Sequence, residues 1–159
     1  LTRRASDLRR AEREPSALGR ARALERLGGF HHEQRDQTAA TGAFLAAAQA
    51  YTEAGESEDA ERAYERLLDI SPDHVNAAAR LMSLKADAGN FAGVADAFGI
   101  VLRASEDNRH AGELLLSVAA AAARAGAAEE FAELADNLQW RLGGDERELS
   151  ARLLRESAR

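Results

Sequence analysis

Residues 44–72 read FLAAAQAYTEAGESEDAERAYERLLDISP and decide the fold. Apolar residues recur every three or four positions on both sides of Gly55, which is the spacing of one face of an α-helix. Gly55 tolerates a left-handed backbone and can end the first helix, whereas the ring of Pro72 cannot continue the hydrogen bonds of the second. The stretch therefore predicts two antiparallel helices, over about 38–54 and 57–70.

The same helix pair recurs twice downstream. Its central glycine returns as Gly89 after 34 residues and as Gly126 after 37 more. The second helix pair keeps the pattern except at Lys85 and Glu106, which replace Tyr and Pro. We expect the three extra residues of the third helix pair to extend the loop near 109–111. The positions predicted to face the core of the first helices are Phe44, Ala47, Ala48 and Tyr51, then Ala78, Leu81 and Met82, then Leu115, Val118, Ala119 and Ala122.

The first helix pair carries the motif Phe44-x2-Ala47-Ala48-x2-Tyr51, Ala60-x3-Tyr64 and Pro72. This motif resembles the tetratricopeptide repeat, W-x2-L-G-x2-Y, A-x3-F and P, with a period of about 34 residues. The resemblance implies an all-α protein, a right-handed α-solenoid of stacked antiparallel helix pairs with about nine helices. Three repeats would cover about 41–74, 75–108 and 112–144, inside a segment over 36–144.

Residues 1–35 are predicted to hold a degenerate helix pair and a connector. A first helix over 1–14 ends at a proline, and Ser16 can cap the helix that follows by accepting from its free amides. We expect Gly28-Gly29 to stop that second helix. The segment 30–37 then reads as a polar connector.

Residues 145–159 are predicted to form a last helix, either a cap on the array or the first half of a further repeat. Trp140 is expected to pack against this helix. The alternative for Trp140 is an anchor for a partner, because Trp is favoured at the centres of interfaces.

The composition favours closely packed helices, since 45% of the 159 residues are hydrophobic but only 5% are aromatic. The absence of Cys excludes disulfides and thiolate chemistry. No apolar run approaches the roughly 20 residues that cross a bilayer, so we expect no membrane insertion. A cytoplasmic location is expected, with the periplasm left open. The start at Leu1 suggests a fragment of a longer protein.

The net charge of −6 conceals an asymmetry. Residues 1–35 contain nine Arg and five acidic residues, a net of +4, which leaves −10 for the remainder. The arginines are spread around two helices and mixed with Asp7, Glu12 and Glu14, whereas binding to phosphates needs them on one face. We therefore expect no nucleic acid partner. Pairing with the acidic remainder, or a solvated face, explains the asymmetry.

The sequence offers no candidate for catalysis. His31-His32-Glu33 is the one cluster of metal-ligand residue types, but adjacent side chains point apart and no third ligand is placed by spacing. We interpret it as a solvated connector and predict no metal and no cofactor. His74 and His110 stand near helix starts, where they are expected to cap or to lie on the surface. The chain is predicted not to be an enzyme.

The resemblance implies a concave groove lined by the first helix of each repeat. Members that clamp a C-terminal carboxylate place Lys and Asn in the first groove helices, but Leu45 and Gln49 stand there, so such a clamp is not expected. Arg80 and Arg124 are candidate anchors for an acidic group. The groove positions are Leu45, Gln49, Thr52, Glu53, Asn76, Ala79, Arg80, Ser83, Asp87, Glu113, Leu116, Ser117, Ala120 and Arg124.

Two functions follow from the resemblance. The first is a non-enzymatic protein–protein interaction scaffold that binds a peptide or a partner helix in the groove. The alternative is an architectural or self-associating segment of a longer array, which could form a homo-oligomer through its terminal helices. The sequence identifies no individual partner.

Overall fold

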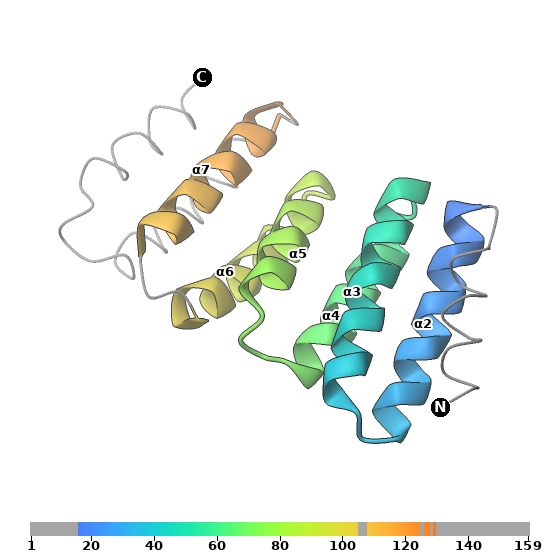
Figure 1. Ribbon diagram of the computed structural model, residues 1–159. Helices are drawn as coiled ribbons and strands as arrows, with labels where there is room; N and C mark the ends of the chain where they lie inside the picture. Colours follow the sequence, from blue (N-terminus) through green and yellow to red (C-terminus); the bar gives the residue numbers. More distant parts are fainter. Residues whose placement is uncertain (1–15, 105–107, 125, 128, 130–159) are drawn as a thin grey trace. The chain divides into compact units, whose positions relative to one another are not determined.

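A computed structural model describes residues 16–104, 108–124, 126, 127 and 129. These residues form helices and no strand, which confirms an all-α protein over that part of the chain (Figure 1). The helices are α2 (Ala17–Glu33), α3 (Gln37–Ala54), α4 (Ser57–Ile70), α5 (Val75–Asp87), α6 (Phe91–Ala104) and α7 (Asn108–Arg124). Apart from Glu129, the other predicted helices, over 1–14, after Gly126 and over 145–159, lie outside the described residues, as does Trp140.

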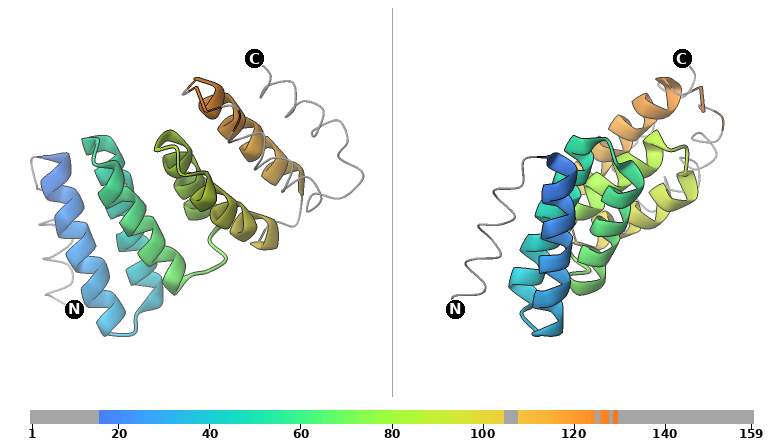
Figure 2. Two further views of the ribbon diagram at one scale, coloured as in Figure 1. Left: turned by 180° about the vertical axis from the view of Figure 1, so that it is seen from behind. Right: turned by 90° about the vertical axis from the view of Figure 1, so that its right-hand side faces the viewer.

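The chain divides into two compact units, Leu1–Pro72 and Asp73–Arg159. In the first unit α3 packs against both α2 and α4, and in the second unit α5, α6 and α7 contact one another. Successive helices within each unit run antiparallel (Figure 2). The predicted helices over 38–54 and 57–70 are confirmed to within one residue by α3 and α4.

The first unit differs from the prediction at the end of α2. The Ser16 hydroxyl accepts from the Gly19 N–H at 2.9 Å, so the predicted cap is confirmed. The predicted stop at Gly28-Gly29 is wrong, because α2 continues to Glu33 and only the residues after it connect to α3. Arg35, with φ of 59°, turns the chain instead.

Gly28 is explained by packing rather than by chain reversal. It is buried, and a Cβ added to it would lie 2.9 Å from Cδ1 of Phe44 on α3. The missing side chain therefore lets α2 approach α3 closely. Both a close approach of helices and a helix end favour glycine, so the sequence alone led to the prediction of a helix end where the structure has a close approach.

The three predicted turns share one geometry. Gly55, Gly89 and Gly126 have φ of 78°, 71° and 73°, in the left-handed region that favours glycine. In each turn the following N–H donates to the carbonyl five residues earlier: Glu56 to Tyr51 at 3.0 Å, Asn90 to Lys85 at 2.8 Å and Ala127 to Ala122 at 2.9 Å. This bond satisfies a carbonyl that the end of a helix leaves free.

The cores of the two units repeat the same positions. Burial of the predicted core positions of the first helices is confirmed, since Phe44, Ala47, Ala48 and Tyr51 in α3, Ala78, Leu81 and Met82 in α5, and Leu115, Val118, Ala119 and Ala122 in α7 are all at most 4% exposed. In the second helices Tyr64 of α4 and Phe98 of α6, 34 positions apart, are also buried. The described part of the chain is therefore a repeat-like helical fold.

The third repeat differs from the prediction at its start. Residues 109–111 were expected in an extended loop, but they belong to the first turns of α7. Ala111 is fully buried, which accounts for the longer helix because it adds an apolar contact to the core.

Candidate functional site

The predicted groove positions of the first unit lie on one face of α3. Leu45, Gln49 and Glu53 are four residues apart, and Leu45 is half-buried while Gln49 and Glu53 are exposed. Glu53 accepts a hydrogen bond from the guanidinium of Arg20 on α2, within an ion pair whose Glu53 side chain is 62% exposed. Exposed pairs of this kind contribute at most about 1 kcal/mol. This contact is a pairing between the basic and acidic parts of the chain, as the charge asymmetry suggested.

The predicted positions of the second unit lie on α5 and α7, two helices that pack against each other. Spacings of three, four and seven residues place the members of each helix on one face. The half-buried members are Ala79, Leu116 and Ala120, and the exposed members are Asn76, Arg80, Ser83, Asp87, Glu113, Ser117 and Arg124.

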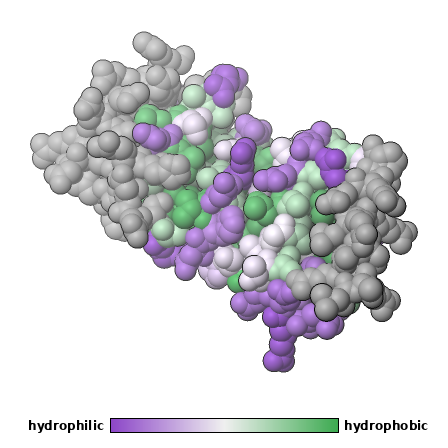
Figure 3. All heavy atoms as spheres, in the orientation of Figure 1, coloured by the Kyte–Doolittle hydropathy of each residue, from purple (hydrophilic) through white to green (hydrophobic). Residues whose placement is uncertain are grey.

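The hydroxyls on these two helices are already satisfied. Ser83 donates to the Ala79 carbonyl at 3.2 Å, and Ser117 donates to the Leu114 carbonyl at 2.7 Å. The exposed charged and amide side chains among the predicted positions are Asn76, Arg80, Asp87, Glu113 and Arg124. The space-filling view shows that hydrophilic and hydrophobic side chains are mixed on the face it presents (Figure 3).

The structure brings the predicted residues of α5 and α7 together in one unit. Leu45, Gln49 and Glu53 belong to the other unit. Binding by any of these residues stays a prediction.

A polar contact in the first unit was not predicted from the sequence. The Tyr51 hydroxyl donates to Oε2 of Glu25 at 2.6 Å, and Arg66 donates to Oε1 of the same carboxylate at 3.4 Å. Glu25 on α2 therefore joins α3 and α4. Burial and the neighbouring carboxylate raise the pKa of Tyr51 to about 12, so its hydroxyl keeps its proton above the pH at which an ordinary tyrosine ionises.

A signal for Glu25 was present in the sequence. A buried tyrosine hydroxyl needs a hydrogen-bond partner, and Glu25 is four residues from Ala21 on the apolar stripe of α2.

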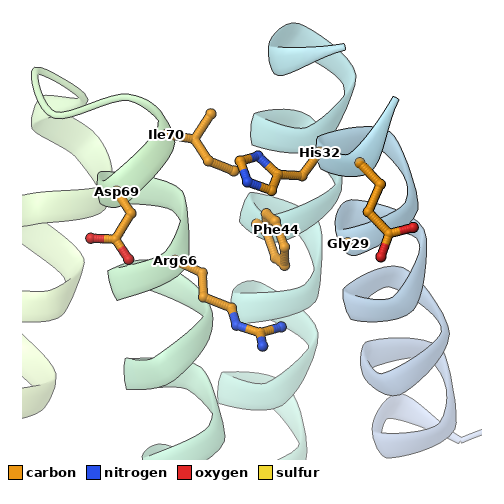
Figure 4. A pocket seen from close by; sticks show the side chains of 7 residues that line it. Gly29, His32, Phe44, Arg66, Asp69 and Ile70 are labelled. Atoms are coloured by element: carbon orange, nitrogen blue, oxygen red, sulfur yellow. The ribbon is translucent and has the colours of Figure 1, made fainter. Parts of the chain in front are cut away.

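An open pocket of about 510 Å³ lies between α2 and α4, over Phe44 of α3. We call it the Phe44 pocket. The His32 ring reaches from α2 across Phe44 toward Ile70 of α4 (Figure 4). The pocket is lined by Gly29, His32, Glu33, Phe44, Arg66, Asp69 and Ile70.

The histidines were only partly placed by the sequence. The prediction that His31-His32-Glu33 is a solvated connector is wrong, because all three residues are in α2 and His31 is only 4% exposed. His74 confirms its predicted role, since its Nδ1 accepts from the Ala77 N–H at 3.1 Å at the start of α5. His110 is in the first turns of α7.

A scan of protein-family models gives no match, and a search of curated proteins gives no significant match. Among the described residues, no three His, Cys, Asp or Glu side chains are grouped so that they could hold a metal ion. Within the same ranges, no helix has the length and apolar character needed to cross a membrane.

Proposed function

We propose that this chain is a non-enzymatic, tetratricopeptide-like scaffold whose helix pairs stack into a right-handed solenoid. The first helices of its repeats, α3, α5 and α7, would bind a peptide or a partner helix. The repeated burial pattern and the shared left-handed turns support this proposal. In each first helix the buried positions recur at the same spacing, whereas the outward positions are not constrained by packing.

The observation that carries the proposal is the surface of α5 and α7 in the second unit. Arg80 on α5 and Arg124 on α7 are exposed, and within the described ranges neither has an ion-pair partner. Half-buried Leu116 and Ala120 provide apolar area on α7. A partner that presents an acidic group and an apolar side chain matches this combination.

The test begins with the full chain as bait in a lysate of its source organism, followed by titration of the purified partner. The double variant Arg80→Glu with Leu116→Glu should abolish binding, because it reverses a charge and places another on the apolar area. Arg103→Glu with Ile100→Glu makes the same two changes on α6 and should leave binding unchanged. Circular dichroism of both variants checks that the helices persist.

Partner binding that survives the α5–α7 variant would refute the proposed surface. Self-association of the chain that the same variant does not affect would favour the architectural alternative.

A further inference from the structure

Gly29 is a helix-interior glycine that packing does not require. Its neighbour Gly28 fits against Phe44, but a Cβ added to Gly29 would meet no atom within 4 Å. Glycine inside a helix lowers stability relative to alanine. Because Gly29 lines the Phe44 pocket, the space that a side chain would take there is space in the pocket. The glycine therefore keeps the pocket open at a cost to the helix.

The inner part of the pocket combines apolar side chains with one cation that is paired with a carboxylate. Phe44 and Ile70 supply the apolar atoms. The Arg66 guanidinium carbon lies 5.8 Å from the centroid of the Phe44 ring, and Glu25 pairs with the same guanidinium. Arg66 thus has an acidic partner on α2.

The two carboxylates of the pocket lie on opposite helices. Glu33 is in the last turn of α2, and Asp69 is in the last turn of α4. Both residues are exposed, and neither has an ion pair with another residue in the part of the chain that the structure describes. The lining therefore holds two carboxylates and one guanidinium, and the guanidinium already has an acidic partner in Glu25.

We propose that the Phe44 pocket binds a peptide segment of a partner protein in which an apolar anchor side chain is flanked by Lys or Arg. The anchor would cover half-buried Ile70 and the small exposed edge of Phe44, which removes apolar surface from water. The flanking cations would pair with Glu33 and Asp69, as the charge of the lining requires. This surface is separate from the predicted groove residues, none of which lines the pocket.

The test uses three end-blocked pentapeptides and the isotope-labelled full chain, observed by nuclear magnetic resonance. The first peptide has phenylalanine between two pairs of lysines, the second replaces the lysines with glutamates, and the third replaces the phenylalanine with glycine. At millimolar concentration the first peptide should shift the amide signals of Gly29 and His32. The other two should leave these signals unchanged.

Two glycines provide matched variants. Gly29→Leu should weaken binding of the first peptide at least about tenfold, since the side chain enters the pocket. Gly42→Leu on α3 should leave binding unchanged, because Gly42 is also helical with open space around its Cβ but does not line the pocket. Thermal unfolding of both variants verifies that they fold.

Separate variants remove the charges of Glu33 and Asp69. Glu33→Gln and Asp69→Asn keep the shape of the pocket, and each should weaken binding about two- to fivefold and reduce its salt dependence. Equal binding of all three peptides, no signal shifts with the first, or full affinity in Gly29→Leu would each overturn the proposal.

Discussion

Gly28→Ala tests the close approach of α2 and α3. The added methyl group would lie 2.9 Å from Cδ1 and 3.0 Å from Cε1 of Phe44, too close for carbon atoms that are not bonded. The Phe44 ring is only 3% exposed, so a shift of the ring disturbs the side chains packed around it. Relieving such a clash in a packed core costs about 1–3 kcal/mol.

A second effect has the opposite sign. Replacing glycine by alanine inside a helix stabilises it by about 0.5–1 kcal/mol. Gly29→Ala should show this gain alone, because its methyl group meets no atom within 4 Å. The two variants share a helix and a chemical change, so the difference between their free energies of unfolding isolates the clash at about 1–3 kcal/mol.

Urea unfolding followed by circular dichroism measures both free energies. Gly28→Ala should be less stable than Gly29→Ala by that difference, and the deficit should shrink when Phe44→Leu removes the ring. If Gly28→Ala is stabilised as much as Gly29→Ala, α2 does not approach Phe44 as described, and packing does not explain this glycine.

Three further predictions concern single contacts. The raised pKa of Tyr51 means that the folded state holds the phenol proton more tightly than the unfolded state, in which the pKa is near 10. This difference should contribute on the order of 1–3 kcal/mol to the free energy of unfolding below about pH 10, and the contribution should be lost as the pH rises toward 12. The free energy of unfolding of Tyr51→Phe, measured by urea unfolding across this range, should lack this pH dependence. Gly55→Ala should lower the free energy of unfolding by about 1–2 kcal/mol because its φ of 78° is left-handed; an unchanged urea midpoint would contradict the turn geometry. His74→Ala should cost about 0.5–2 kcal/mol by removing the cap on Ala77, with His74→Asn retaining most of the stability in the same measurement.

The sequence predicted those features that depend on positions along one helix. The period of three and four residues around Phe44 and Tyr51 identifies a buried face wherever the chain lies, because helix geometry alone determines which residues share it. The turn at Gly55 was predictable for a similar reason, since a left-handed residue is a local backbone property.

Features that depend on the distance between helices were not predictable. The pair Gly28-Gly29 is equally compatible with a helix end and with a close crossing, and only the position of Phe44 on the neighbouring helix decides between them. The predicted connector over 30–37 was wrong for the same reason: because α2 continues to Glu33, His31 lies in the core and His32 lies over Phe44. The candidate pocket therefore could not be derived before α2 was known to extend past its glycines.

The two adjacent glycines also separate a structural requirement from a functional one. Substitution at Gly28 is opposed by the packing of α2 on α3, so its identity is explained whether or not the protein binds anything. Substitution at Gly29 is opposed by no atom, and alanine would stabilise the helix there. Gly42 is also helical and free of contacts but does not line the pocket, so open space at a glycine is not by itself a sign of a ligand. For this reason binding by Gly29→Leu, rather than its stability, is the measurement that decides whether the Phe44 pocket is a site.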